Sequence, residues 1–395
     1  MRLAFFDFNI NYGGAPQGSV YLARRLSARH DVHVIDAYGY CAEYCSAIRQ
    51  AGLGLHILLE SAQAVYIGSK ENRLLRLMRA AKQLPQLMEV RRRLIQAVEL
   101  IKPDVIWVNN EKSLTFLSSS RRLRRYPAVM YCRGWATEDQ VSGWLKYLMR
   151  HHTSAIIAHA QATLAQLRER GIDSQKLHYT PNTIDFDSVL SQSQTPPDTP
   201  LPSCPGDLKL LLPAARPTRE KGHLEAVRAV KTLRDRGYQP ILWLPGKNAT
   251  GVSDAFSREL MGLIDELGLR EVIHFIGWHH NVPALIQACD VVVLPTYTEG
   301  FPRAVLEAML LKKPVCTTPV GGIPEAIVHR KTGLLSRVGD DLELANHIEL
   351  LITDAEVRQH IVDQAFAYVT QAHHPDLNTQ AVEAVFAKAA QSKSR

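Results

Sequence analysis

The 395-residue sequence predicts an α/β protein built from two doubly wound parallel sheets. Short apolar segments alternate with longer amphipathic segments, and this rhythm is typical of a parallel sheet with helices on both faces. The alternation breaks clearly at residues 191–207, where Ser, Pro and Asp are frequent. We therefore expect one domain at 1–195 and a second at 205–371, with a helix at about 372–395 that packs back on the first.

Five apolar segments in the first half and five in the second are expected to form the strands. In the first half they are "RLAFFDF", "DVHVIDAY", "DVIWVNN", "AVMYCRG" and "SAIIAHA". In the second half they are "LKLLLPAA", "PILWLPG", "VIHFIG", "DVVVLP" and "KPVCTTP". Ligands of open parallel sheets bind beyond the carboxyl ends of the strands. The loops that follow these strands should therefore face a cleft between the two domains.

Composition limits the class of protein. The 46% apolar content is enough to build ordinary cores, so we expect a globular chain. The first residues lack the apolar run and cleavage site of a secretory signal, and no later run approaches the roughly 20 apolar residues that cross a bilayer. We therefore expect a cytoplasmic location. The formal charge of +7 favours an anionic partner, which nucleic acid, acidic lipid or a phosphorylated substrate would satisfy.

The segment "PTYTEGFPRAVLEAM" carries two glutamates where a strand gives way to a helix. Pro302 is suited to a first helical position, which places Glu299 in the loop and Glu307 inside the helix. Carboxylates accept hydrogen bonds from sugar hydroxyls, and the free backbone amides from Gly300 to Val305 would favour a phosphate. The alternative is structural, with Glu299 as a helix cap and Glu307 as a solvated surface residue.

Two further loops point to the same chemistry. The segment "ARPTREKG" places Arg216, Arg219 and Lys221 after the first strand of the second domain, where cations could neutralise a departing pyrophosphate. A solvated basic turn is the alternative. In the first domain, Gly13 and Gly14 follow the first strand and would allow close approach of a phosphate or sugar, although such a glycine turn is more often structural.

Together these segments resemble the family 4 glycosyltransferases, which are retaining enzymes of the GT-B fold that use nucleotide sugars. The resemblance covers nearly the whole chain and implies two Rossmann-like domains that face a central cleft. Its most specific part is the pair of glutamates separated by seven residues, with the flanking strand and helix. The other matching segments are the Gly13-Gly14 loop, "ATLAQLRERGIDSQKLHYTPNTID", "ARPTREKG", "VIHFIGW" and "KTGLL".

The resemblance also implies roles for individual residues. Glu299 would contact the hydroxyls of the donor sugar and Glu307 those of the ribose, while Arg216 and Lys221 would hold the diphosphate. The catalytic set is then Arg216, Lys221 and Glu299. The donor-binding set is Gly14, Trp278, Gly300, Phe301, Pro302, Arg303, Ala304, Val305 and Glu307. The resemblance implies no metal and no cofactor besides the donor, for which UDP is favoured and GDP and ADP are alternatives.

Two positions depart from the family pattern. Where the family often has His followed by Gly, this chain has Arg133 and Gly134. Arginine cannot act as a neutral acid or base, so we interpret Arg133 as an acceptor or anion contact. The other departure is Thr183, in "PNTID", where the family usually has Gly, and we expect it only to alter a turn.

A basic segment near residues 70–93 suggests contact with an anionic membrane surface. Arg73, Arg76, Arg79 and Lys82 recur at helical spacing beside leucines, and three consecutive arginines follow at 91–93. Such a helix would suit a peripheral protein on the inner face of the membrane, and an ordinary solvated helix face is the alternative. The basic segments "SSSRRLRRYP" and "WLKYLMRHH" add charge to the same half.

Other partners are not favoured by the sequence. The adjacent histidine pairs lack metal-ligand spacing, and no module for nucleic-acid binding is recognised. We therefore predict transfer of a hexosyl or N-acetylhexosaminyl unit to a glycan or lipid-linked acceptor in bacterial surface polysaccharide biosynthesis. The alternatives are a nucleotide-sugar epimerase of the same fold and a non-catalytic sugar-binding or scaffold protein.

Overall fold

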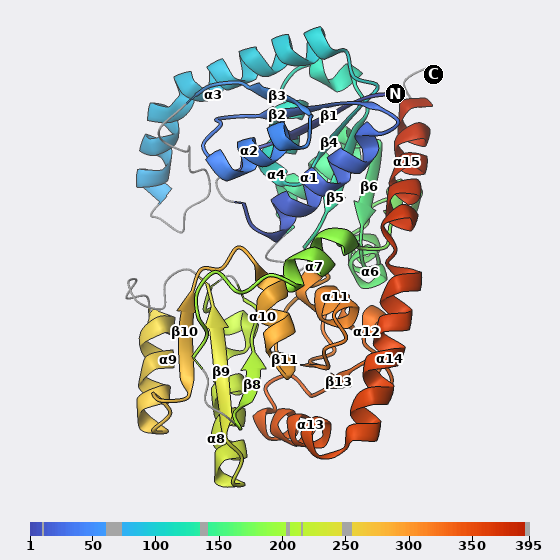
Figure 1. Ribbon diagram of the computed structural model, residues 1–395. Helices are drawn as coiled ribbons and strands as arrows, with labels where there is room; N and C mark the ends of the chain where they lie inside the picture. The colour runs from blue at the N-terminus through green and yellow to red at the C-terminus, as the bar shows by residue number, and fades with distance from the viewer. Residues whose placement is uncertain are drawn as a thin grey trace. The chain divides into compact units, whose positions relative to one another are not determined.

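The computed structural model describes residues 1–9, 12–60, 73–134, 141–202, 206–214, 216–246 and 255–391, without the side chains of 73–82. The chain forms two compact units (Figure 1). Unit 1 comprises Met1–His159, Thr163–Thr180 and Thr379–Arg395, and unit 2 comprises Ala160–Ala162 and Pro181–Asn378.

Unit 1 contains a seven-stranded sheet in the order β3-β2-β1-β4-β5-β6-β7, and every neighbouring pair is parallel. The strands are β1 (Arg2–Asp7), β2 (Asp31–Asp36), β3 (Gly54–Ile57), β4 (Val105–Val108), β5 (Ala128–Cys132), β6 (Ala155–Ala158) and β7 (Leu177–Tyr179). The helices are α1 (Gly14–Ser27), α2 (Ala42–Gln50), α3 (Arg73–Ile101), α4 (Glu111–Ser118), η1 (Leu123–Arg125), α5 (Gly143–His152), α6 (Gln161–Glu169) and η2 (Ser174–Lys176).

Unit 2 contains a six-stranded sheet in the order β10-β9-β8-β11-β12-β13, again with parallel neighbours. The strands are β8 (Leu208–Leu211), β9 (Pro240–Pro245), β10 (Ile273–Gly277), β11 (Val291–Leu294), β12 (Val315–Thr317) and β13 (Leu334–Leu335). The helices are α7 (Phe186–Ser193), η3 (Arg219–Lys221), α8 (His223–Asp235), α9 (Ala255–Glu266), α10 (Val282–Ala288), α11 (Arg303–Leu310), α12 (Ile323–Ala326), α13 (Asp341–Thr353) and α14 (Ala355–Ala372), with α15 (Pro375–Gln391) continuing into unit 1.

Burial on both faces of the sheet explains the near-continuous apolar strands. Along β1, Leu3 and Phe5 pack into a core with α1, α2 and α15, whereas Ala4 and Phe6 pack into a second core with α3, α4 and α5. Alternate residues of a strand face opposite sides of the sheet, so a strand covered on both sides must be apolar throughout. The predicted α/β class with two parallel sheets is confirmed.

The chain passes into unit 2 earlier than the break in the sequence pattern. The units divide between Thr180 and Pro181, and α7 then belongs to unit 2, where Ile184 and Val189 are buried in its core. The Pro-rich segment at 191–207 follows α7. The segment that includes α7 belongs to unit 2 because its apolar side chains are buried there. The position of the Pro-rich segment in the sequence does not determine this.

The long helix α3 covers the basic segment near residues 70–93, but the side chains of 73–82 lie outside the described residues. Of the three later arginines, Arg92 and Arg93 form ion pairs with Glu89, and Arg91 binds Ser119. These arginines therefore have intramolecular partners. Within the described ranges, no helix has both the length and the apolarity that crossing a bilayer requires.

The C-terminal helix α15 anchors the end of the chain to unit 1. Its Phe386 is fully buried with its ring centroid 5.4 Å from that of Trp107, and Glu383 accepts hydrogen bonds from Arg29 and pairs with His30. Arg25 also donates to Thr379 over 2.8 Å. The helix thus completes one face of the sheet.

We expect Phe386→Ala to lower the free energy of unfolding by about 3–5 kcal/mol, because the ring fills a closed core that cannot collapse around alanine. Urea denaturation followed by tryptophan fluorescence measures this change. Leu377→Ala on the same helix is the matched control, since Leu377 is 45% exposed. Equal losses in the two variants would mean that α15 does not contribute a core side chain.

Candidate functional site

The loop after β11 carries Glu299 into the start of α11. Buried valines form β11, and Pro302 then serves as the N-cap with φ −72° and no side-chain cap bond, so Glu299 does not cap this helix. The helix begins at Arg303, one residue later than the predicted start at Pro302. By position, the amides of Arg303 and Ala304 lack an intrahelical acceptor. The loop therefore places a carboxylate beside amides that favour anions.

The loop after β8 lies against the loop after β11 because the two strands are neighbours in the sheet. Gly222 has φ +72°, and a Cβ there would lie 2.0 Å from the carbonyl oxygen of Pro295. The carbonyl of Glu220 accepts hydrogen bonds from the Tyr297 amide at 2.8 Å and the Thr296 hydroxyl at 2.7 Å. Tyr297 in turn donates its hydroxyl to Glu225 over 2.8 Å. These contacts fix the two loops to each other.

The two loops bring Lys221 and Glu299 together. The Lys221 ammonium donates to Oε1 of Glu299, with the lysine side chain 33% exposed and the glutamate 12% exposed. A charge-assisted bond that is partly removed from water is among the stronger side-chain interactions. The residue predicted to bind the diphosphate and the residue predicted to bind the donor sugar are thus direct neighbours in unit 2.

The other two cations of this loop behave differently. Arg219 pairs with Glu259 of α9. Arg216 is exposed and makes no hydrogen bond or ion pair with the part of the chain that the structure describes. The structure therefore places Arg216 in the same loop as Lys221 but gives it no contact with Glu299.

Glu307 is buried inside α11, and this contradicts its interpretation as a solvated surface residue. Burial raises the pKa of its carboxyl group. The charge of nearby Arg303 lowers this pKa, but burial has the larger effect. The guanidinium of Arg303 lies 3.6 Å from Oε1 of Glu307, one helical turn away. A carboxylate kept at such cost in a core is typical of a functional group.

The backbone between these glutamates is held by residues that the sequence did not single out. The Gly322 amide donates to the carbonyl of Gly300 over 2.8 Å, and the Asn182 side chain donates to the carbonyl of Phe301 over 3.1 Å.

Thr183, expected only to alter a turn, donates its hydroxyl to the carbonyl of His373 over 2.8 Å. Trp278 follows β10, half-buried, with its indole nitrogen 3.4 Å from His280.

Gly14 and Arg133 belong to unit 1. Gly14 is the first residue of α1, and Gly18 in the same helix faces Arg133, whose Nη1 would lie 2.9 Å from a Cβ at position 18. The guanidinium of Arg133 stacks 4.5 Å from the ring centroid of Tyr131. A glycine therefore leaves the space that this arginine occupies.

A buried acid at the end of β1 was missed by sequence reasoning. Asp7 accepts hydrogen bonds from Asn109, Asn110 and Ser113, which follow β4, and burial raises its pKa. Lys112 lies over the ring of Phe8 at 4.1 Å, and burial lowers the pKa of its ammonium to about 8. The sequence offered a partial signal, because the polar residues in "DF" and "NN" end two of the predicted strands.

We expect Gly222→Ala to be more destabilising than Gly268→Ala by more than about 1 kcal/mol, because alanine at 222 meets a carbonyl as well as an unfavourable φ. Gly268 has φ +65° and open space around a Cβ, so it isolates the backbone effect. Thermal denaturation of both variants measures the difference. Equal losses would show that the close contact with Pro295 carries no energy.

Glu307→Gln should stabilise the protein at pH 8, since it removes a carboxyl group whose ionised form is disfavoured by burial. The pKa of Glu307 is raised on folding, so its ionised form opposes folding at high pH. The gain should vanish as the pH falls below the ordinary glutamate pKa of about 4.3. Exposed Glu271→Gln is the control for urea denaturation. Destabilisation at every pH would show that the carboxylate supports the fold.

Comparison with known proteins assigns the chain to a family. Residues 12–188 match the family model for Glycosyltransferase Family 4, and residues 203–367 match that for Glycosyl transferases group 1. Together the two matches span most of the chain.

Curated relatives match over part of their length. A D-inositol 3-phosphate glycosyltransferase of Arthrobacter sp. is 31% identical over 51% of this chain and 48% of its own. The lipopolysaccharide core biosynthesis glycosyltransferase LpsD of Rhizobium meliloti is 30% identical over 40% of this chain and 43% of its own. The chain covers between 25% and 51% of the length of such relatives.

A solved structure shares the fold over its whole length. Anabaena Alr3699/HepE in complex with UDP and glucose is similar with a TM-score of 0.78 and 22% identity, over 98% of this chain and 100% of that one. The two parallel-sheet α/β units are those of the GT-B fold. From its family matches and its fold, the chain belongs to glycosyltransferase family 4.

Proposed function

We propose that the protein is a retaining, metal-independent glycosyltransferase. It would move a hexosyl or N-acetylhexosaminyl unit from a nucleoside-diphosphate sugar to a hydroxyl of a glycan or lipid-linked acceptor. The observation that carries this proposal is the Lys221–Glu299 pair beside the first turn of α11. Membership of the family supports the transferase class.

The pair suits a ligand with a diphosphate next to a sugar. Phosphate oxygens would accept hydrogen bonds from the Lys221 ammonium and from the first-turn amides of Arg303 and Ala304. Sugar hydroxyls would donate hydrogen bonds to Glu299. Each partner of the ion pair would then exchange one charge-assisted bond for another. Exposed Arg216 in the same loop would add a second cation to the diphosphate.

The same groups would assist departure of the nucleoside diphosphate. Negative charge grows on the leaving phosphate as the glycosidic bond breaks, and fixed donors stabilise this charge without reorganisation. Two cations and two amides would supply what a divalent metal supplies elsewhere. In the retaining reaction, the acceptor hydroxyl would attack the face that the diphosphate leaves and would pass its proton to the departing phosphate oxygen.

Further donor contacts would come from Glu307 and Trp278. Glu307 would accept hydrogen bonds from the ribose hydroxyls, and the backbone near Trp278 would contact the base. UDP is our preferred nucleotide, which the complexes of HepE with UDP and with UDP-glucose support. An acceptor from bacterial surface polysaccharide is supported by the relative named for lipopolysaccharide core biosynthesis.

The decisive experiment is a thermal-shift panel of UDP-, GDP- and ADP-sugars with the free nucleotides, with and without EDTA. We expect one nucleotide to raise the melting temperature regardless of EDTA, because a ligand that binds the native state stabilises it. With that donor, Lys221→Ala, Glu299→Ala and Arg216→Ala should each lower turnover by at least about tenfold.

Arg219→Ala is the matched control, because Arg219 lies in the same loop but pairs with Glu259. It should keep nearly full turnover. Wild-type turnover in the Lys221 or Glu299 variant would overturn the site assignment. A panel without any shift would contradict the donor class, and a shift abolished by EDTA would contradict metal independence.

A further inference from the structure

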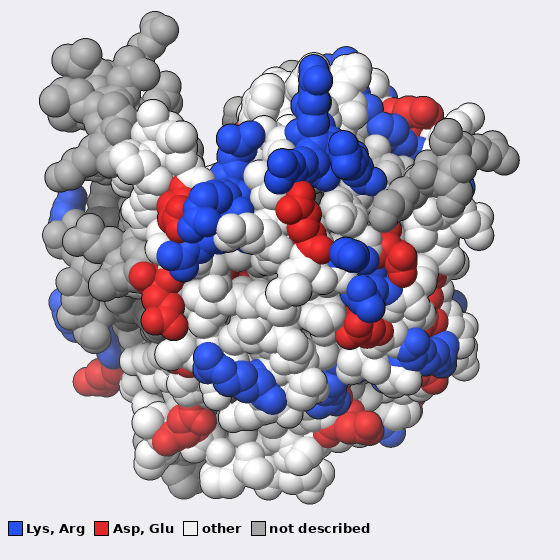
Figure 2. All heavy atoms as spheres, turned by 90° about the horizontal axis from the view of Figure 1, so that it is seen from above, with Lys and Arg blue, Asp and Glu red and all other residues white. Residues whose placement is uncertain are grey.

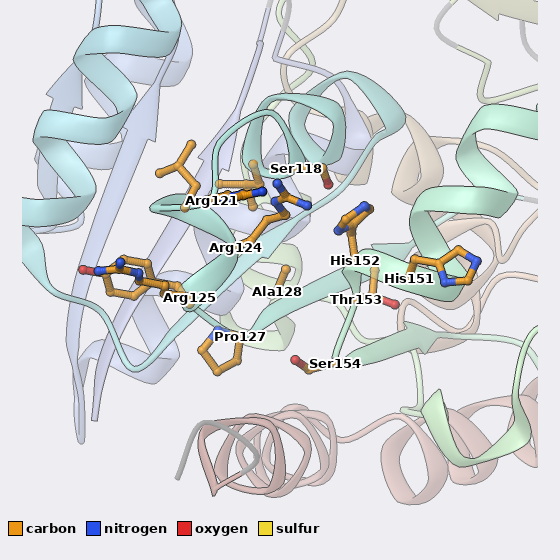
Figure 3. Close-up of a pocket in the computed structure, with 13 residues that line it drawn as sticks. Ser118, Arg121, Arg124, Arg125, Pro127, Ala128, His151, His152, Thr153 and Ser154 are labelled. Atoms are coloured by element: carbon orange, nitrogen blue, oxygen red, sulfur yellow. The ribbon is translucent and has the colours of Figure 1, made fainter. Parts of the chain in front are cut away.

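A basic pocket lies in unit 1 at the amino-terminal ends of β5 and β6 (Figure 3). Its cavity of about 480 Å³ is bounded by the end of α4, by η1 and by the last turn of α5. Ligands of parallel sheets in transferases of this kind bind at the carboxyl ends of strands. The pocket occupies the opposite edge of the sheet, so donor and acceptor binding do not explain it.

The pocket is lined by cations without acidic partners. Arg121, Arg124 and Arg125 are exposed, and none of their guanidinium groups makes a hydrogen bond or ion pair with another described residue. Neither Asp nor Glu occurs among the described residues that line the cavity. By contrast, neighbouring Arg122 does not line it and pairs with Glu99 at 3.5 Å. Lys and Arg gather in several groups on the face seen from above (Figure 2).

The cations are held on a fixed frame. Buried Leu123 anchors η1, and the Arg124 amide donates to the carbonyl of Ser120 over 3.0 Å. At the end of α5, Lys176 donates to the carbonyls of Arg150 and Thr153, over 2.6 and 2.8 Å. These bonds place a cation at the negative end of α5, where it satisfies two carbonyl groups.

His152 faces the arginines. Figure 3 shows the ends of Arg121 and Arg124 near Ser118, with the ring of His152 on the same side, whereas Arg125 points away. Burial lowers the pKa of His152, and the charges of Arg124, His151 and Lys176 lower it further. The positive charge of Arg124 therefore disfavours protonation of His152, and an anion bound between the two groups would favour it.

We propose that this pocket binds a phosphate-bearing ligand through Arg121, Arg124 and His152. A guanidinium donates two parallel hydrogen bonds to phosphate oxygens, and a protonated imidazole adds a third donor. The cavity volume falls in the range of small-molecule sites. A soluble phosphate ester and a phosphomonoester headgroup of a lipid share this chemistry. The inference is independent of the transferase activity.

The test follows the ring resonances of His151 and His152 in protein labelled with ¹³C-histidine, with His152→Gln to assign them. Inorganic pyrophosphate is the soluble probe. The lipid probe is sedimentation with phosphatidylcholine vesicles that contain phosphatidic acid, beside pure phosphatidylcholine. Because the reporter lies in the pocket, pyrophosphate bound elsewhere in the protein does not mimic the signal.

A soluble ligand predicts saturable pyrophosphate shifts and a raised pKa of His152. A lipid ligand predicts sedimentation only with phosphatidic acid. In either case Arg121→Ala with Arg124→Ala should weaken binding by at least about tenfold, because charge-assisted contacts are lost. Arg122→Ala should bind as the wild type does. Absence of both signals, or equal losses in the double variant and in Arg122→Ala, would overturn the proposal. Circular dichroism verifies that each variant is folded.

Discussion

The candidate site depends on the contact between Gly222 and the carbonyl of Pro295. Strands β8 and β11 are neighbours, so the loops that follow them start side by side, but only a residue without a side chain allows them to touch. Gly222 also takes a left-handed conformation, which turns the chain from η3 into α8. Because the loops touch there, Glu220 reaches Thr296 and Tyr297, and Lys221 reaches Glu299. The ion pair is thus a consequence of backbone packing, with the side chains completing an approach that the loops have already made.

Hydrogen bonds to the backbone extend this order to the start of α11. Gly322 and Asn182 hold the carbonyls of Gly300 and Phe301, so those two peptide groups are oriented before any ligand arrives. Ordering a loop costs free energy, and a site that is ordered during folding avoids this cost on binding. The same logic accounts for Glu307. Its burial raises the pKa of the carboxyl group and opposes folding at neutral pH, which a purely structural helix position would not require.

Sequence patterns predicted the strands and helices better than they predicted the surroundings of individual side chains. Buried parallel strands leave continuous apolar runs, so both sheets and the glutamate-bearing loop could be predicted. The pattern could not show that Glu307 is buried, since a glutamate inside a helix has the same sequence whichever way it faces. Nor could it show that Asp7 is enclosed by Asn109, Asn110 and Ser113, because these residues lie about 100 positions away and meet only through strand order. The passage between units at Thr180 depends similarly on which core buries Ile184 and Val189.

The family departure at Arg133 has a physical counterpart in α1. Its guanidinium lies over the ring of Tyr131 and against Gly18, where any Cβ would come within 2.9 Å of Nη1. An arginine needs more room than a histidine, and the missing side chain at position 18 leaves that room. Stacking on an aromatic face covers the weakly hydrated plane of a guanidinium while its edge can still donate hydrogen bonds. The substitution is therefore accommodated by two neighbours, Gly18 and Tyr131, that suit an arginine.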